Sequence, residues 1–262
     1  MIKAAVLGSP IEHSLSPLIH NQAYEILGIE GQYSKIEMNG EDFIPFIQSE
    51  SENGWTGFSL TMPLKESALS IGFECEDRAR RIHSVNTLIH QNGTFVGYST
   101  DVRAFDRLID GLTFSSVAVI GGGGPARAAL GALDGVVERI DVIQRSSHRN
   151  DLLTQALISS GINFKDMGAS LENYDLVIST TPAGVSDFFV SSLGENPGTL
   201  IEVLYKPLPT KLSAAWKERG GFVVDGLDLL VEQALDQIHL MTSLNFDFAS
   251  MRASLIANLR SL

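Results

Sequence analysis

The chain passes from a hydrophobic run into a glycine-rich turn at Val117-Ala118-Val119-Ile120-Gly121-Gly122-Gly123-Gly124-Pro125-Ala126-Arg127. The first four residues are apolar and three of them are β-branched, which predicts a strand buried on both faces. The glycines allow a sharp turn beneath a phosphate, and Pro125 starts a helix. Gly121, Gly123 and Ala126 fit the pattern G-x-G-x-x-G/A, in which amides at a helix N-terminus bind a pyrophosphate.

A second predicted strand supports this interpretation, which matters because glycine runs also occur in ordinary turns. Arg139-Ile140-Asp141-Val142-Ile143 reads as a strand. It follows an interval of helical length that contains Ala128, Ala129, Leu130, Ala132 and Leu133. The three elements form a βαβ unit, whose crossover should be right-handed.

Composition and charge limit the possible partners. Of the 262 residues, 44% are hydrophobic and 19% are charged, which is typical of a globular protein with one large core or two modest ones. The net charge of −12 repels nucleic acid and anionic membranes at long range. We therefore expect a small-molecule substrate, and an anionic one must meet locally placed cations.

Cys75 is the only cysteine, so the chain has no intrachain disulfide and no cysteine cluster for a metal. Its neighbours Glu74, Glu76 and Asp77 disfavour a thiolate, and we interpret it as inert. The apolar run at the N-terminus is too short for a signal peptide, and no run reaches the ~18 apolar residues of a membrane-spanning helix. These features predict a cytoplasmic protein without a metal site.

Two serines follow the first predicted strand, Met1–Gly8. If the segment after the strand is extended, Ser14 and Ser16 point the same way, because side chains two apart share a face. Ser16 could also be the N-cap of the helix that begins at Pro17. Both interpretations can hold, since a cap residue can border a binding site.

The segment Thr56–Met62 alternates between apolar and polar residues, with Ser59 and Thr61 on the polar face. Lys65 follows where the chain turns into a helix. Hydroxyls and an ammonium thus gather at the carboxyl end of a strand, the usual ligand side of an open α/β sheet, although a lone lysine is most often a solvated surface charge. The apolar face consists of Phe58, Leu60 and Met62.

A hairpin is predicted over Val85–Tyr98, with Asn92-Gly93 as its type I′ turn. Asn86 lies near its start and Asp101 just after its end. Thr100 can cap the following helix, in which case Asp101 is also a first-turn acid favoured by the helix dipole.

The remaining elements complete two halves that meet near residue 104, where hydroxyl-rich strands give way to the βαβ unit. Further strands are predicted at Gln32–Met38, Asp175–Pro182, Thr199–Tyr205 and Gly221–Gly226, and further helices at Glu41–Ile47, Leu229–Ser243 and from Phe246 onward.

The end of the second βαβ strand distinguishes between the nicotinamide cofactors. It continues as Gln144-Arg145-Ser146-Ser147-His148-Arg149. A fold that binds NAD usually has an acid there for the ribose 2′-hydroxyl, whereas a 2′-phosphate requires guanidinium groups. Arg145 and Arg149 are present, and Asp141 begins the strand too far back. The sequence therefore predicts NADP(H).

Seven motifs, in order along nearly the whole chain, resemble those of the shikimate dehydrogenases. They are Ser14-Leu15-Ser16-Pro17, Thr61-x-Pro63-x-Lys65, Val85-Asn86-Thr87-Leu88, Thr100-Asp101, Gly121-x-Gly123-Gly124-x-x-Arg127, Tyr205-x-Pro207-x-x-Thr210, and Asp225-Gly226-Leu227 with Gln233. The resemblance implies an enzyme that reversibly reduces 3-dehydroshikimate to shikimate with NADPH, a step of aromatic amino acid biosynthesis.

The resemblance also implies an α/β fold with two domains and the active site in the cleft between them. Residues 104–229 would form a Rossmann-type doubly wound parallel sheet that binds NADP, and residues 1–103 and 230–262 a second α/β domain that binds substrate. Lys65 and Asp101 would be the catalytic pair.

The resemblance assigns ligand contacts by position. Ser14 and Ser16 would bind the substrate carboxylate. The other substrate-binding residues would be Ser59, Thr61, Asn86, Gln233 and Tyr205. The cofactor-binding residues would be Gly121, Gly123, Gly124, Pro125, Ala126, Arg127, Gln144, Arg145, Ser146, Arg149, Thr180, Thr181, Val203 and Gly226.

The chain departs from the family pattern in ways that bear on substrate recognition. Ser59 stands where the family usually has asparagine, and offers one hydroxyl in place of an amide. Tyr98-Ser99 replaces the usual Asp-Asn, and Val102 a usual glycine.

Alternatives remain open at this point. A quinate/shikimate dehydrogenase of broader specificity shares the fold and the Lys/Asp pair, but such enzymes often carry an acid where this chain has Ser146-Ser147. A non-catalytic shikimate sensor is disfavoured because Lys65 and Asp101 are both present and no helix-turn-helix is appended. His13 and His83 are competing acid/base candidates, and monomer and homodimer are both compatible with the sequence.

Overall fold

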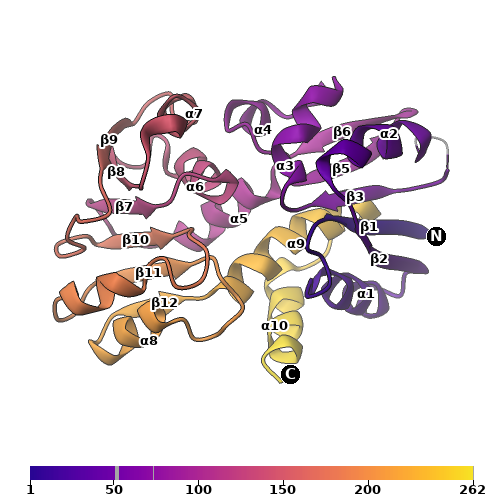
Figure 1. Ribbon diagram of the computed structural model, residues 1–262. Helices are drawn as coiled ribbons and strands as arrows, with labels where there is room; N and C mark the ends of the chain where they lie inside the picture. The colour runs from indigo at the N-terminus through magenta and orange to yellow at the C-terminus, as the bar shows by residue number, and fades with distance from the viewer. Residues whose placement is uncertain (51–52, 73, 262) are drawn as a thin grey trace. The chain divides into compact units, whose positions relative to one another are not determined.

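The computed structural model describes residues 1–50, 53–72 and 74–261. It divides into two compact units, and each has its own sheet (Figure 1). Unit 1 consists of Met1–Arg103 and Val231–Leu262, and unit 2 of Ala104–Leu230. Helices and sheets are both abundant in the two units, which confirms the predicted α/β fold class.

The sheet of unit 1 is mixed and has the order β2-β1-β3-β5-β6-β4. Its strands are β1 (Ile2–Gly8), β2 (Gly31–Glu37), β3 (Gly57–Leu60), β4 (Glu74–Cys75), β5 (Thr87–Gln91) and β6 (Thr94–Tyr98). β1 pairs in parallel with β2 and β3, whereas β5 is antiparallel to β3 and β6. The predicted hairpin is confirmed: Asn92 and Gly93 join β5 and β6 with φ of 51° and 82°, as a type I′ turn requires.

Alternate residues of β1 point to opposite sides of this sheet, and a buried cluster covers each side. Ala5 and Leu7 belong to a buried cluster that includes Phe43 of α2 (Gly40–Glu50). Ala4 and Val6 belong to a second cluster, to which helices on the other face contribute. Those helices are α1 (Ser16–Leu27), through Tyr24, and α9 (Gly226–Thr242), through Met241.

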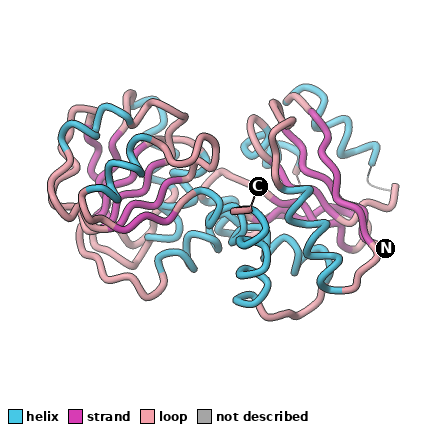
Figure 2. Tube along the Cα trace, turned by 90° about the horizontal axis from the view of Figure 1, so that it is seen from below, coloured by secondary structure: helices cyan, strands magenta, loops and turns pink. Residues whose placement is uncertain are grey.

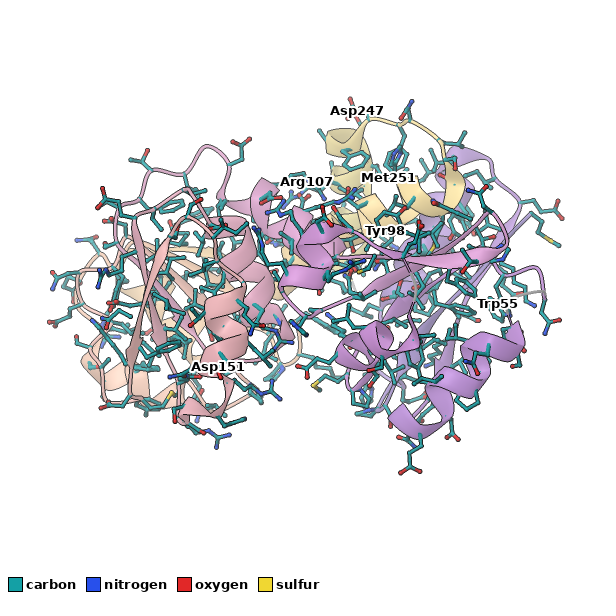
Figure 3. All side chains as sticks on the ribbon, turned by 90° about the horizontal axis from the view of Figure 1, so that it is seen from above. Trp55, Tyr98, Arg107, Asp151, Asp247 and Met251 are labelled. Atoms are coloured by element: carbon teal, nitrogen blue, oxygen red, sulfur yellow. The ribbon has the colours of Figure 1, made fainter. Side chains whose placement is uncertain are left out.

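The remaining helical elements of unit 1 are α3 (Leu64–Ser67), η1 (Ala68–Ile71), α4 (Asp77–Arg81), α5 (Thr100–Ile109) and α10 (Phe248–Leu259), of which α5 continues into unit 2. The carboxylate of Asp247 accepts the N–H of Ser250 at 2.8 Å and caps α10; Figure 3 labels Asp247 and Met251 at this end of the helix. Asn258 of α10 donates to Gln22 of α1 at 2.7 Å, which ties the last helix to the first.

The sheet of unit 2 is entirely parallel and has the order β12-β11-β10-β7-β8-β9. Figure 2 shows its strands side by side in magenta, with helices in cyan. Counted from β7, this is the doubly wound order of dinucleotide-binding folds, with its switch point between β7 and β10. The strands are β7 (Val117–Ile120), β8 (Arg139–Ile143), β9 (Gly161–Lys165), β10 (Leu176–Ser179), β11 (Thr199–Glu202) and β12 (Phe222–Val224). The helical elements are α6 (Gly124–Leu133), η2 (Ser147–Arg149), α7 (Asn150–Gln155), η3 (Asp187–Ser192) and α8 (Lys211–Glu218).

Several sequence-based predictions are wrong at the ends of elements. Ser16 is the first residue of α1 and is not its N-cap. Leu15 has φ −89° and ψ −5°, so the segment that carries the two serines is helical, not extended, at this position. Met62 does not join the apolar face of β3: the strand ends at Leu60, and the Met62 side chain is 71% exposed. The helix predicted over Leu229–Ser243 is α9, which begins earlier, at Gly226.

Within the described residues, no helix combines the length and the apolar character that crossing a membrane requires.

Candidate active site

Topology places the polar residues of unit 1 at one edge of its sheet. β1 and β3 are parallel and end together, so Ser14 and Ser16 follow β1 at the edge where Thr61 and Lys65 follow β3. β5 is antiparallel to β3, so Asn86, just before β5, lies at that edge too; its carbonyl accepts the N–H of Leu60 at 2.7 Å. Asp101 comes shortly after β6, which runs antiparallel to β5 and therefore ends there as well.

Lys65 and Asp101 form an ion pair at this edge. Lys65 lies in α3 and Asp101 in the first turn of α5, and Nζ donates to Oδ2 over 2.6 Å. The two side chains are only 19% and 11% exposed. A charge-assisted hydrogen bond of this length in a partly buried place is stronger than a surface ion pair, and it fixes the direction of the ammonium group.

Asn86 orients the carboxylate of Asp101. Its Oδ1 accepts the backbone N–H of Thr100 at 2.7 Å, and its Nδ2 donates to Asp101 Oδ1 at 2.9 Å. Because a backbone N–H can only donate, the amide oxygen of Asn86 must face Thr100 and its nitrogen must face Asp101. The Asn86 side chain is therefore the acceptor of the Thr100 backbone N–H. The prediction that Thr100 caps this helix is wrong, because Thr100 is its first residue.

Gln233 of α9 completes this group. Its Oε1 lies 3.5 Å from Nδ2 of Asn86, and the residue is buried. The structure thus brings together four residues that the sequence singled out at widely separated positions: Lys65, Asn86, Asp101 and Gln233.

Ser14, Ser16 and Thr61 have other hydrogen-bond partners. Ser14 Oγ accepts the N–H of Ser16 at 3.3 Å; Ser16 is buried and Ser14 half-buried. Thr61 donates its N–H to the carbonyl of Leu7 at 2.9 Å. Gly8 must be glycine here, because a Cβ would lie 2.3 Å from Cγ2 of Thr61.

Ser59 has a partner that sequence reasoning missed. Tyr33 of β2 donates from Oη to Ser59 Oγ at 2.6 Å, and both residues are buried. Burial raises the pKa of Tyr33, which keeps the phenol protonated as a donor. A hydroxyl that accepts one hydrogen bond still has its own proton to donate, so Ser59 is set up as a donor.

In unit 2 the glycine turn fits a phosphate. Gly121 has φ 120° at the end of β7, where a Cβ would lie 2.3 Å from Oγ1 of Thr180. Thr180 follows β10, so the two residues flank the switch point of the sheet, where doubly wound folds bind nucleotides. Gly123 is the N-cap of α6 and offers no side-chain cap, which suits a helix whose first turn meets an anion.

Of the two arginines after β8, Arg149 lies near this turn. Arg149 is half-buried, and its Nη1 lies 3.4 Å from the carbonyl oxygen of Gly122. Arg145 is exposed. Asp141 is occupied elsewhere, since it binds Lys165 at 2.7 Å and Tyr174 at 2.5 Å.

The other predicted cofactor residues are spread over unit 2. The start of α6 consists of Gly124, Pro125, Ala126 and Arg127, of which Arg127 is fully buried. Three other side chains are hydrogen-bonded within unit 2: Gln144 to Asn150, Ser146 to His148, and Thr181 to Ser186. Gly226 is buried and close to the carbonyl group of Leu204, so a side chain would not fit. Val203 donates its N–H to the carbonyl of Ser179 at 3.0 Å. Tyr205, unlike the other predicted substrate-binding residues, belongs to unit 2.

Comparison with known proteins identifies the family. The family model of the shikimate dehydrogenase substrate binding domain matches residues 6–88. A shikimate dehydrogenase (NADP(+)) from Bacillus cereus is 30% identical over 97% of this chain and 97% of its own. The chain belongs to the shikimate dehydrogenase family. This confirms the resemblance seen in the sequence.

Solved structures agree with this membership. Shikimate dehydrogenase from Mycobacterium tuberculosis superposes with a TM-score of 0.89 at 32% identity, covering 98% of this chain and 100% of its own. A quinate dehydrogenase from Corynebacterium glutamicum, solved in complex with NAD, gives a TM-score of 0.86 at 25% identity over 98% of this chain and 99% of its own. The fold alone therefore does not distinguish the two activities within the family.

A second residue that sequence reasoning missed is Glu202, at the end of β11. It is buried, and accepts from the N–H of Leu204 at 3.4 Å and from Thr210 Oγ1 at 3.3 Å. Burial raises the pKa of Glu202 to about 7. These bonds hold the segment that carries Val203 and Tyr205. An acid at the end of an apolar strand was the available signal.

The other reactive candidates are less well placed. His13 and His83 are exposed. Burial, together with Glu76 and Asp77, raises the pKa of the Cys75 thiol against the opposing effect of Arg80, as expected for an inert cysteine. No group of three or more His, Cys, Asp or Glu side chains in the described part of the chain is arranged to bind a metal ion.

Proposed function

We propose that this chain catalyses the reversible NADPH-dependent reduction of 3-dehydroshikimate to shikimate, with unit 1 binding the substrate and unit 2 the cofactor. The observation that carries the proposal is the Lys65–Asp101 ion pair of 2.6 Å, held beside Asn86 and Gln233. The name of the Bacillus cereus relative, shikimate dehydrogenase (NADP(+)), supports both the reaction and the cofactor.

Lys65 is the group that meets the developing charge. NADPH, when bound, supplies the hydride that adds to the carbonyl carbon. The addition leaves negative charge on the carbonyl oxygen, which needs a cation or proton donor within hydrogen-bond reach. The Lys65 ammonium fills this role and delivers the proton that completes the alcohol. Asp101 aims the ammonium, and we rank proton donation with electrostatic stabilisation above simple base catalysis.

The remaining unit 1 residues bind the substrate away from the reacting carbon. Ser14 and Ser16 bind its carboxylate through their hydroxyls. Ser59 donates one hydrogen bond, because its oxygen already accepts from Tyr33. The residues that contact the substrate hydroxyls are Thr61, Asn86 and Gln233, and Tyr205 is a further substrate-binding residue.

The cofactor residues follow from the glycine turn and the arginines after β8. A cradle that a Cβ at Gly121 would fill, beside Thr180, suits the pyrophosphate. Arg145, Ser146 and Arg149 suit the 2′-phosphate of NADP, because guanidinium groups bind phosphate through paired charge-assisted hydrogen bonds. The other residues proposed to line this site are Gly123, Gly124, Pro125, Ala126, Arg127, Gln144, Thr181, Val203 and Gly226.

A four-way assay tests the proposal: oxidation of shikimate or quinate by the purified protein with NADP⁺ or NAD⁺. We expect kcat/KM to be highest for shikimate with NADP⁺. A preference for quinate with NAD⁺ would favour a quinate dehydrogenase instead, the activity named for the Corynebacterium glutamicum structure. Absence of turnover with all four pairs, by protein shown to be folded, would reject a dehydrogenase of this substrate class.

A further inference from the structure

A row of buried polar side chains leads from α1 to Asp101. His20 of α1 is 0% exposed, Gln237 of α9 1%, Thr87 of β5 0% and Asn86 2%. His20 Nε2 lies 3.1 Å from Gln237 Oε1, and Gln237 Nε2 donates to Thr87 Oγ1 at 3.0 Å. Thr87 Oγ1 in turn donates to Asn86 Oδ1 at 3.1 Å. The row ends where Asn86 meets the carboxylate of Asp101.

The direction of every bond follows from one fixed point, the backbone N–H of Thr100. This group must donate, so it meets the oxygen of Asn86. Toward that same oxygen, 3.1 Å away, Thr87 can only donate, and it is nearer than the hydroxyl oxygen of Thr100 at 3.3 Å. The proton of Thr87 therefore goes to Asn86, which leaves the Thr87 oxygen to accept. The amide nitrogen of Gln237 therefore faces Thr87, and its oxygen faces His20.

The same reasoning fixes the state of His20. Since an amide oxygen only accepts, Nε2 of His20 carries the hydrogen. Burial lowers the pKa of His20 to about 3, so the ring is neutral with Nδ1 unprotonated. Nδ1 has no hydrogen-bond partner among the described residues, and the ring stacks on Tyr33 with centroids 3.9 Å apart. Packing and one directed bond thus hold the imidazole.

We propose that His20, Gln237 and Thr87 are positioning residues of the reaction, which act on Asp101 through Asn86. Their donors all point toward Asp101: His20 to Gln237, Gln237 to Thr87, and Thr87 to Asn86. This holds the Asn86 nitrogen on Asp101 Oδ1 and leaves Oδ2 to Lys65. In a dry interior each bond of such a chain strengthens the next. The inference rests on the proposed function, which makes Lys65 and Asp101 the catalytic pair.

Substitutions at Thr87 separate positioning from packing. Thr87→Val keeps the shape and removes the hydroxyl, whereas Thr87→Ser keeps the hydroxyl and loses a methyl group. We expect Thr87→Val to lower kcat for shikimate oxidation by about threefold to tenfold, the range that the loss of one neutral hydrogen bond produces, with KM within about twofold. Thr87→Ser should restore most of kcat although it also leaves a small cavity.

Two further variants complete the experiment. Gln237→Met, of similar length, should lower kcat as much as Thr87→Val does. The double variant should have a kcat only slightly below that of either single variant, because both substitutions interrupt the same row of hydrogen bonds. Ser84→Ala is the control: Ser84 is fully buried and its hydroxyl has no hydrogen-bond partner among the described residues, so kcat should not change. Wild-type kcat in Thr87→Val and Gln237→Met, with only a lower Tm, would overturn the inference and leave the proposed function intact.

A readout without turnover makes the two failures distinguishable. In NMR spectra of the wild-type protein, the ¹⁵N shifts of His20 should report a neutral ring protonated at Nε2. The side-chain amide signals of Asn86 should move in Gln237→Met and Thr87→Val and stay in place in Thr87→Ser. If the wild-type protein does not oxidise shikimate, the proposed function is wrong, and only these signals test whether the row of hydrogen bonds acts on Asn86. Asn86 signals that do not move in Gln237→Met and Thr87→Val would overturn the inference.

Discussion

Replacement of Asp101 by asparagine tests the geometry of the candidate site most directly. Each carboxylate oxygen of Asp101 accepts a separate donor: Oδ1 accepts from Asn86 at 2.9 Å and Oδ2 from Lys65 at 2.6 Å. An amide of the same shape has one acceptor oxygen and one donor nitrogen. In Asp101→Asn, that oxygen can serve only one of the two donors, and the new NH₂ group must face the other.

The cost follows from this mismatch. The bond to the charged Lys65 is the stronger one, so the oxygen should turn to Lys65 and leave two NH₂ groups facing each other at Asn86. An unsatisfied buried donor costs about 1–3 kcal/mol, which corresponds to a roughly five- to 150-fold lower kcat if the lost order acts on the reacting group. KM should change less than kcat, because the serines that bind the substrate carboxylate are untouched and the variant disturbs only the contact that Asn86 makes to a substrate hydroxyl.

Lys65→Ala is the companion variant. It removes the proposed proton donor itself, and general acid groups contribute about 10²- to 10⁴-fold. Steady-state kinetics of both variants with shikimate and NADP⁺, with Tm measured in parallel, should give a larger loss of kcat for Lys65→Ala than for Asp101→Asn. A Lys65→Ala enzyme with near-normal kcat, beside a His13→Ala or His83→Ala enzyme that loses it, would refute the assignment of the pair.

Three further predictions concern the cofactor, the substrate and acid stability. Arg145→Ala should raise KM for NADPH by about tenfold to 150-fold, since a charge-assisted contact is worth about 1.5–3 kcal/mol. The same variant should leave KM for NADH nearly unchanged. Equal use of both cofactors by the unmutated protein would contradict this prediction. Ser14→Ala and Ser16→Ala should raise KM for shikimate with little change in kcat, because the carboxylate is bound alike in ground and transition states; an unchanged KM in both would remove them from the substrate site. The buried His20 has a pKa of about 3, below its value of about 6.5 in the unfolded chain. Between these pH values the unfolded state binds more protons, so the free energy of unfolding falls as the pH falls, by at most about 1.4 kcal/mol per pH unit. Urea unfolding at pH 7, 5.5 and 4.5 should show a shallower loss for His20→Leu, and parallel curves would mean that His20 is not buried and neutral.

Patterns that involve neighbouring residues predicted the fold well. The β-branched run before Gly121 forms β7, all of it buried, and the doubly wound order around it explains why glycine is needed beside Thr180. The Asn92-Gly93 pair forms the predicted turn, because positive φ at both positions is a property of those two residues.

Element ends were predicted less well, since they depend on contacts that are distant in sequence. Ser16 has the residue type of an N-cap, yet the helix includes it and Leu15 precedes it in a helical conformation. Met62 fits the alternation of β3, but the strand stops at Leu60, where the chain turns toward Lys65. In both cases the element boundary lies one or two residues from the position that the local pattern predicts.

The buried chain that ends at Asp101 left one signal in the sequence. His20 and Gln237 are 217 residues apart, and no local pattern joins a histidine of the first helix to a glutamine of the ninth. Gln233 and Gln237, however, are four residues apart on one helix, and residues so spaced share a face. Since Gln233 meets Asn86, Gln237 must lie one turn further along that same face, where apolar side chains would be expected. A glutamine there requires partners for both ends of its amide, and the structure supplies them as Thr87 and His20.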